Sequence, residues 1–556
     1  ILDTTVPQSL HSVIQYRIDS LNRRTRLVLQ CGAVLGQRFS FGILSLFEAI
    51  KQNLVEQLAV LRGLRFLEEY PPPPELEYAF LHPLARDVAY QNLPEEQKRI
   101  LHGKIAEQME IYLDKRIPEY YGTLAYHFER ANNVAKALYY AIKSGERAVG
   151  LAANREALQH FERALYLLEH SGNGTARRIR ECRLLCVIGR LRRILGDVTG
   201  GMQALDRALR LSVELSNQHL ESESAYELAA ARQVTGEYDR AEQFAVRALK
   251  LAHNQRRRAL EAQLHNILGM IAWGRSRFDE ALVCYGKVFG LGLEDEAPSV
   301  LADAHNNAGL IHWQQGRYEQ ALAEMHQCSE LAGRMGDRFR IAATVMNMGI
   351  IQERLGRFRA ACRSYENALE LSERIGFRQG ACAALANLSN LCLVKRKPRE
   401  ALDYAARSQQ VAHDIGDRRS EAIAEENMGL ACLLTRDFDS ALGHFSRAMR
   451  LARAIGDLER QVSVGLAKIE LDLERPGKPV SAQRIRSLVR MVEAHRFRDY
   501  MPRALRNLGR VLSSNRKSRA EGETTLRRAL AEAQQLSNMP EQIACRRCLE
   551  DAKMKP

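Results

Sequence analysis

Five asparagines recur in register through the middle and C-terminal parts of the sequence, and their side chains are suited to binding. Successive members are 40 residues apart, with one repeat skipped before the last. A side-chain amide offers both a donor and an acceptor, which an extended peptide backbone presents in alternation. A ladder of such amides can therefore hold a backbone without reading its sequence. The five residues are Asn307, Asn347, Asn387, Asn427 and Asn507.

A polar residue inside a helix also has a purely structural explanation. Buried polar groups need hydrogen-bond partners. The same asparagines can therefore bond to the next repeat and fix how successive helices stack. The sequence leaves binding and stacking equally open, and a single residue can do both.

Residues beside this column would add selectivity to a bound segment. Asn266 and Asn306 come one residue before the column position, and Asn390 comes three residues after it. Trp313 offers an apolar wall, and the equivalent positions become basic toward both ends. A groove with amides in its middle and cations at its ends suits an acidic or carboxylate-ending segment. The basic positions are Arg190, Arg193, Arg503, Arg506 and Arg510.

A 40-residue repeat positions these side chains. A turn of the form Gly-x-aromatic recurs at Gly236-Glu-Tyr, Gly316-Arg-Tyr and Gly356-Arg-Phe, and a small residue such as Gly309 or Gly349 lies seven positions before the turn. Internal periods of about 20–50 residues indicate a stacked array. Each unit is predicted to be two antiparallel helices of roughly 15 residues, because small residues recur where two helices must approach closely.

These residues resemble the tetratricopeptide repeat. That family has a small residue at its eighth position, a Gly-x-Tyr/Phe turn and two later alanines. Here Gly309, Tyr318, Ala321 and Cys328 occupy those places. The resemblance covers about residues 130–540 and is closest to the long-helix variety of kinesin light chains and bacterial signalling proteins. It implies an all-α, right-handed superhelix with a concave face lined by the first helix of each pair. In peptide-binding members, an Asn at the sixth position holds the ligand's backbone or carboxylate.

The N-terminal part does not follow the repeat. Helices followed by a small hairpin favour a winged helix, with a stiff proline tip at Pro71 to Pro74. Arg23, Arg24 and Arg26 are candidates for contacts with nucleic-acid phosphates. The expected elements are two helices within 8–36, a helix opening at 37–42, a helix at 54–62 and strands at 65–70 and 76–81.

Short motifs in residues 1–170 resemble the segment that follows the nucleotide-binding module in signal-transduction ATPases with numerous domains. They include Val6-Pro7-Gln-Ser-Leu and Phe80-Leu-His-Pro-Leu-Ala-Arg-Asp-Val-Ala-Tyr90. In that family an ATPase core precedes a winged helix and tetratricopeptide repeats, in regulators that also carry a kinase, a cyclase or a DNA-binding domain. The resemblance implies a cytoplasmic bacterial-type regulator with an ATPase module upstream of Ile1. It also implies a winged helix that packs on that module rather than on DNA.

The sequence lacks signatures of catalysis. The string nearest to a phosphate-binding loop, His102-Gly-Lys-Ile105, has neither the hydroxyl residue nor the upstream glycine that such a loop needs. Cys545-Arg-Arg-Cys548 is the one C-x-x-C among eleven cysteines, so no zinc set is completed. We therefore predict no catalytic residue, no metal site and no cofactor.

Composition and charge bound the remaining choices. Hydrophobic residues make up 46% and charged residues 27%, as in ordinary folded chains. No apolar run is long enough to cross a membrane. The net charge of +14 suggests acidic partners, nucleic acid included. We predict a non-catalytic protein- or peptide-binding scaffold and sensor arm, with a nucleic-acid-binding regulator as the alternative.

Four segments are expected along the chain. Terminal repeats of such arrays are irregular because they face solvent and act as caps. The segments are a winged-helix module at 1–92, a connector with compressed first repeats at 93–178, regular repeats at 179–458 and degenerate repeats with a cap at 459–556.

Overall fold

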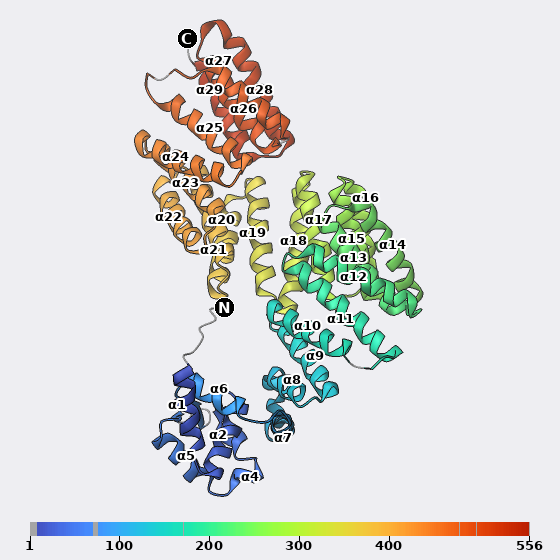
Figure 1. The fold of residues 1–556 in the computed structure, drawn as a ribbon. Helices are drawn as coiled ribbons and strands as arrows, with labels where there is room; N and C mark the ends of the chain where they lie inside the picture. The colour runs from blue at the N-terminus through green and yellow to red at the C-terminus, as the bar shows by residue number, and fades with distance from the viewer. Residues whose placement is uncertain (1–7, 71–75, 171, 478, 496, 555–556) are drawn as a thin grey trace. The chain divides into compact units, whose positions relative to one another are not determined.

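The computed structural model describes residues 8–70, 76–170, 172–477, 479–495 and 497–554, and helices dominate throughout (Figure 1). The chain forms two compact units, Ile1–Gln255 and Arg256–Pro556. Apart from one short sheet, the described residues outside loops are helical, which confirms the predicted all-α fold. The boundary between the units falls inside the segment 179–458 that the sequence predicts as one regular array.

The first unit opens with helices and a small sheet. Its three strands are antiparallel in the order β1-β3-β2. The helix predicted to open at 37–42 is wrong for its first residues, because Arg38 pairs with Ala79 of the hairpin. The proline tip lies outside the described residues. The elements are α1 (Gln8–Asp19), α2 (Arg23–Leu35), β1 (Arg38–Ser40), α3 (Phe41–Leu44), α4 (Glu48–Lys51), α5 (Leu54–Gly63), β2 (Leu67–Tyr70) and β3 (Glu77–Phe80).

The rest of the first unit consists of helices that pack on their neighbours in the chain. One hydrophobic core runs from Ile14 in α1 to Leu220 in α13, so the N-terminal module and the first helical pairs share buried surface. The helices are α6 (Pro83–Gln91), α7 (Glu95–Leu113), η1 (Asp114–Tyr120), α8 (Tyr121–Arg130), α9 (Val134–Gly150), α10 (Asn154–Glu169), α11 (Thr175–Ile194), α12 (Val198–Glu214), α13 (Gln218–Val234) and α14 (Tyr238–Asn254).

The second unit is a stack of antiparallel helical pairs (Figure 1). Helices α19, α20 and α21 each have 17 residues, slightly more than predicted. The helices are α15 (Arg258–Gly274), α16 (Phe278–Gly290), α17 (Pro298–Gln314), α18 (Tyr318–Met335), α19 (Arg338–Arg354), α20 (Phe358–Arg374), α21 (Arg378–Val394), α22 (Pro398–Ile415), α23 (Arg418–Leu434), α24 (Phe438–Ala454), α25 (Leu458–Glu474), α26 (Ala482–Ala494), η2 (Arg498–Tyr500), α27 (Met501–Ser513), η3 (Arg516–Ser518), α28 (Arg519–Gln535) and α29 (Met539–Met554).

The column of small residues lets the two helices of a pair touch. A Cβ atom added at Gly349 would lie 2.5 Å from the ring of Tyr365 in the facing helix. Interiors are packed too densely to accept such an overlap without movement. Where the column carries Ser389 instead, the hydroxyl fits because it donates a 2.8 Å hydrogen bond to the carbonyl oxygen of Ala401.

The first helices of most neighbouring pairs also touch one another in the second unit. Contacts join α15 to α17, α19 to α21, α21 to α23, α23 to α25 and α25 to α27. Within the described part of this unit, the second helices α16, α18, α20, α22 and α24 do not contact each other to a similar extent. The stack therefore curves with its first helices on the inner side, which is where the predicted binding residues lie.

Candidate functional site

The asparagine column runs along the seams between these inner helices. Its members lie at equivalent positions of α17, α19, α21, α23 and α27. Each member that forms a side-chain hydrogen bond to another helix reaches the preceding inner helix, 37 to 41 residues earlier in the chain. The column is therefore brought together as the sequence predicts, but its members differ in how they are satisfied.

At the start of the unit, three amides bond to one another. The Nδ2 of Asn307 donates to the Oδ1 of Asn266 at 3.2 Å, and the Nδ2 of Asn306 donates to the Oδ1 of Asn307 at 3.4 Å. Asn266 and Asn307 belong to α15 and α17, so this chain of amides links two repeats. Here the column contributes to stacking.

Toward the C-terminus the column is buried. Asn427 is 6% exposed, and its Nδ2 donates to the carbonyl oxygen of Ala386 at 3.1 Å. Asn507 is fully buried, and its Nδ2 lies 3.3 Å from an oxygen of Glu470. These two asparagines also fix the seams between inner helices and expose little surface to a ligand.

Asn347 and Asn387 form the exception. Both are half-buried on inner helices, and neither has a hydrogen-bond partner among the residues that the structure describes. An amide held near a surface without a protein partner offers its donor and its acceptor to a ligand or to water. Asn390, one helical turn after Asn387, is exposed, and its Nδ2 donates to Glu353 at 3.3 Å.

Glu353 accepts the hydrogen bond of Asn390, although it was not among the site residues predicted from the sequence. It lies at the end of α19, half-buried, and the hydroxyl of Tyr365 donates to it at 2.9 Å. Burial raises the pKa of this carboxyl above its ordinary value, against the opposite effects of the Tyr365 hydrogen bond and the Arg354 charge. The sequence does set Glu353 apart, because the equivalent positions 40 residues before and after it hold the apolar residues Trp313 and Leu393.

The arginines predicted at the C-terminal end are already engaged by carboxylates. Arg503 binds Glu470 with two bonds of 3.0 and 2.7 Å, and Arg506 lies 3.0 Å from Glu470 and from Glu541. Burial alone would raise the pKa of Glu470, but the two guanidinium groups outweigh it and hold that pKa well below its ordinary value. Arg510 pairs with Glu474 at 2.6 Å.

The predicted basic positions of the first unit show the same pattern. Arg190 and Arg193 of α11 lie 3.7 and 3.4 Å from Glu227 of α13, which is 6% exposed. Glu227 stands in the asparagine column, 80 residues before Asn307. Burial raises its pKa and the two arginines oppose that rise. The cationic positions at both ends of the predicted groove thus have partners within the chain.

The three arginines predicted to contact nucleic-acid phosphates belong to the first unit. Arg23 and Arg24 are exposed at the start of α2, while Arg26 donates to the carbonyl oxygen of Leu21 at 3.3 Å. The residues that the structure describes contain no group of three or more His, Cys, Asp or Glu placed to hold a metal ion. None of the described helices is long and apolar enough to cross a membrane.

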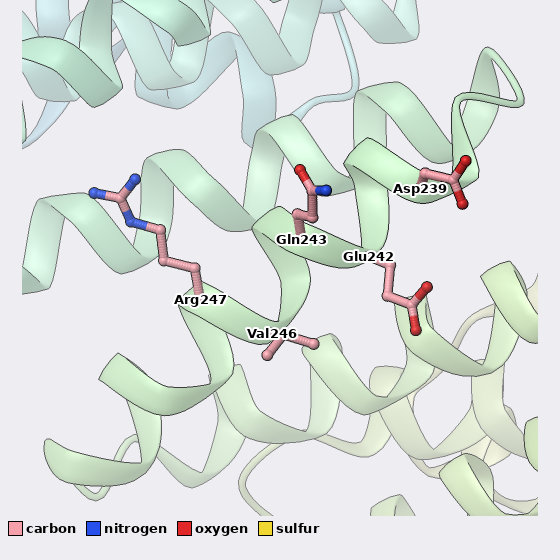
Figure 2. Close-up of a pocket in the computed structure, with 5 residues that line it drawn as sticks. All are labelled: Asp239, Glu242, Gln243, Val246 and Arg247. Atoms are coloured by element: carbon pink, nitrogen blue, oxygen red, sulfur yellow. The ribbon is translucent and has the colours of Figure 1, made fainter.

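A surface hollow in the first unit follows a single helix. Figure 2 shows the five residues that line it spread along α14 rather than converging from separate elements. Its Arg247 already bonds to Glu221 at 2.6 Å. The hollow brings no set of polar groups to a common point, so it is not a candidate site. The lining residues are Asp239, Glu242, Gln243, Val246 and Arg247.

Comparison with known families identifies the repeat. Residues 300–374, which include α18 and α19, match the family model of the tetratricopeptide repeat. These residues therefore carry the tetratricopeptide repeat, as the turn and small-residue columns predict. An uncharacterized protein of Rhizobium meliloti (strain 1021) is 24% identical over 225 residues, which is 39% of this chain. The match spans 21% of that relative's length.

The chain is also similar to solved structures of other proteins. One is a Signal Transduction ATPase with Numerous Domains from Pyrococcus horikoshii that has a tetratricopeptide repeat sensor. It is 14% identical, with 84% of this chain and 69% of that chain covered and a TM-score of 0.49. Another is the apo form of the quorum sensor NprR from B. thuringiensis, 14% identical, with 64% and 99% covered and a TM-score of 0.43.

Proposed function

We propose that the inner face of the second unit binds an extended protein segment and that the chain acts as a non-catalytic scaffold and sensor arm. The observation that carries this proposal is the unpartnered state of Asn347 and Asn387, which hold the same position in successive repeats. Their neighbours in the column have partners, so the free pair marks one stretch of the face. Two amides one repeat apart can bond to donor and acceptor groups of an extended backbone.

The amides, rather than the arginines, support this proposal. The predicted preference for an acidic or carboxylate-ending segment depended on free cations at the basic positions. Arg503 and Arg506 are already neutralised by Glu470 and Glu541. An acidic ligand would have to displace those carboxylates, and separating a buried pair is costly. Backbone recognition by Asn347 and Asn387 needs no such displacement.

Retention of defined peptides tests the proposal. The full chain is immobilised and exposed to pools of extended peptides of about ten residues, blocked at both ends. The Asn347→Ala, Asn387→Ala double variant should retain them about tenfold less than the parent, because it loses two backbone contacts. Asn367→Ala is the matched control, since Asn367 is exposed on the second helix α20. Equal retention by the double variant and the parent would show that the amides do not form the site.

We also propose that the N-terminal module is a winged helix with a structural role. Its strand order β1-β3-β2, with helices α1 to α5 before the hairpin of β2 and β3, supports that assignment. The helix before the hairpin is α5, which would read bases in a DNA-binding winged helix. It exposes Val55 and Val60, and its Arg62 is paired with Glu69. Little positive charge is left on α5 for phosphates, so nucleic-acid binding is the weaker alternative.

The wider setting completes the proposal. In it, the repeats are the sensor arm of a cytoplasmic signalling regulator, and the winged helix relays their state to an ATPase module of the same protein. Nucleic-acid binding would instead show an affinity that falls steeply with salt. A duplex-DNA titration at two salt concentrations therefore separates the two functions, because retention of uncharged peptides should change little with salt.

A further inference from the structure

One carboxylate on the inner face interrupts an apolar column. The positions equivalent to Glu353 hold Trp273, Trp313, Leu393 and Leu433 in the neighbouring regular repeats. An apolar residue at this place packs against the next inner helix without needing a hydrogen-bond partner. A glutamate there must be desolvated in part, which is unfavourable for its charged form. Packing alone therefore does not account for the glutamate.

No cation of the described chain is paired with this carboxylate. Its hydrogen bonds come from the neutral groups of Tyr365 and Asn390, at 2.9 and 3.3 Å. The nearest guanidinium in the sequence, that of Arg354, instead lies 3.4 Å from Asp499. The other inner-face carboxylates described above, Glu470 and Glu474, each have an arginine. Glu353 is thus held in a fixed orientation by two neutral groups, and the charge of Arg354 acts on it without forming an ion pair.

An unpartnered amide lies on the neighbouring inner helix, on the side that reaches Glu353. Asn387 precedes Asn390 by three residues, so the two share one side of α21. Asn390 reaches Glu353 across the seam, and Asn347 lies on the same helix as Glu353. One carboxylate without an ion pair and the unpartnered amide of Asn387 therefore border the seam between α19 and α21, and Asn347 lies six residues before Glu353 on α19.

We propose that Glu353 accepts a cationic group of the bound segment, either a lysine or arginine side chain or a free amino terminus, beside a backbone held by Asn387. This inference rests on the proposed peptide-binding function and names its ligand class. An ammonium or guanidinium group would neutralise the charge of the partially buried carboxylate and donate a charge-assisted hydrogen bond to it. The hydroxyl of Tyr365 and the amide of Asn390 position the carboxylate for that contact.

Four matched pools of peptides of about ten residues test the ligand class on the immobilised full chain. All contain small and apolar residues; the pools differ only in charge. The first is blocked at both ends and uncharged, and the second adds one lysine. The third has a free amino terminus without lysine, and the fourth is blocked and carries one glutamate. Comparing the second and third pools separates a side-chain cation from an amino terminus as the source.

The parent should retain one of the two cationic pools about tenfold better than the uncharged pool. Glu353→Gln should lose that advantage while still retaining the uncharged pool, because glutamine keeps an acceptor for Tyr365. Glu353→Leu, which places here the residue type found at the equivalent position Leu393, should also lose that advantage. It gives a second test of the proposal if Glu353→Gln does not fold. Glu366→Gln, at an exposed position of α20, should behave as the parent.

The outcomes separate the two proposals. Equal retention of cationic and uncharged pools by the parent, a cation advantage that survives Glu353→Gln, or a preference for the glutamate pool would each overturn the ligand class alone. Retention of no pool, or retention that the Asn347→Ala, Asn387→Ala variant leaves unchanged, would overturn the proposed function and the ligand class with it.

Discussion

Two stretches of the inner face share one scaffold but differ in how their polar groups are satisfied. Between α25, α27 and α29, Glu470 binds two arginines and the buried Asn507, and a second carboxylate, Glu541, completes the network. On α19 and α21, two amides lack hydrogen-bond partners in the described chain and the carboxylate of Glu353 lacks an ion-pair partner. The repeat position alone therefore does not decide whether a polar side chain stabilises the stack or remains available.

The difference separates stability from function. A satisfied buried network makes one arrangement of helices favourable, whereas an unsatisfied polar group costs free energy in the folded state. Sites with unsatisfied polar groups are often functional, because a bound ligand can supply the missing hydrogen bonds. On this argument the α25–α29 stretch holds the stack together, and the α19–α21 stretch is the part that can gain from a ligand.

The largest effect is expected from neutralising Glu470. Glu470→Gln leaves Arg503 with much less compensation in a mostly buried place, and Arg506 then depends on Glu541. Removing one partner of a buried pair typically costs about 3 kcal/mol or more. A urea titration of the full chain should show that loss in the second unit. A loss below about 1 kcal/mol would mean that the network is solvated and that the two stretches are alike.

The scaffold itself should respond equally in both stretches. An added Cβ would lie 2.5 Å from Tyr365 at Gly349 and 2.7 Å from Leu526 at Gly509. Overpacking of this kind costs about 2 kcal/mol, so Gly349→Ala and Gly509→Ala should lower stability by similar amounts. Gly443→Ala is the control, because its Cβ would meet only Arg447 at 3.9 Å. Thermal unfolding of the three variants would reveal whether one stretch is packed more loosely.

Substituting single asparagines should change stability by different amounts in the two stretches. Asn507→Ala removes a buried hydrogen bond to Glu470 and should cost about 1 kcal/mol. Asn347→Ala removes a half-buried amide without a described partner and should change stability by less than about 0.5 kcal/mol. Parallel urea titrations give the comparison. Equal losses in the two variants would place Asn347 in the stacking role that the sequence also allowed.

Much of the fold follows from local patterns that are visible in the sequence. The 40-residue interval between Gly316 and Gly356, and the small residues at Gly309 and Gly349, predict helical pairs because close approach needs those residue types. The strand at Arg38–Ser40 was missed, because three residues carry too little pattern and their pairing partner lies about 40 residues away. The break into two units at Gln255 has no local signal either.

The candidate site was predictable as a column but not member by member. The register places Asn307, Asn347 and Asn507 on equivalent positions of inner helices, as expected. Which of them is free depends on the neighbouring repeat: Asn307 meets Asn266, while Asn507 meets Glu470. Such pairings join residues 37 to 41 positions apart and depend on side-chain geometry across a seam. Glu353 also differs from its column in the sequence, because the two equivalent positions on either side of it are apolar.

The smallest expected effect is the change in stability caused by Glu353→Gln, and its sign should be opposite to that of Glu470→Gln. Burial raises the pKa of Glu353 above 4.5, whereas arginines lower that of Glu470 below it. At neutral pH the folded protein therefore carries a penalty for the charge of Glu353 and a gain from that of Glu470. Glu353→Gln should raise stability by about 0.5 kcal/mol, in the range of such substitutions. Glu470→Gln should lower it.

The pH dependence follows from the same directions. As pH falls through the raised pKa of Glu353, the folded state takes up a proton and its penalty disappears, so the advantage of Glu353→Gln should vanish near pH 4.5. The contribution of Glu470 is present above 4.5 and is lost as pH falls toward its lowered pKa, so the deficit of Glu470→Gln should shrink in acid. Urea titrations between neutral pH and mild acid measure both trends. If the parent were more stable than Glu353→Gln at neutral pH, the chain itself would stabilise the charged form of Glu353. This carboxylate would then not be available to pair with a cationic group of a ligand.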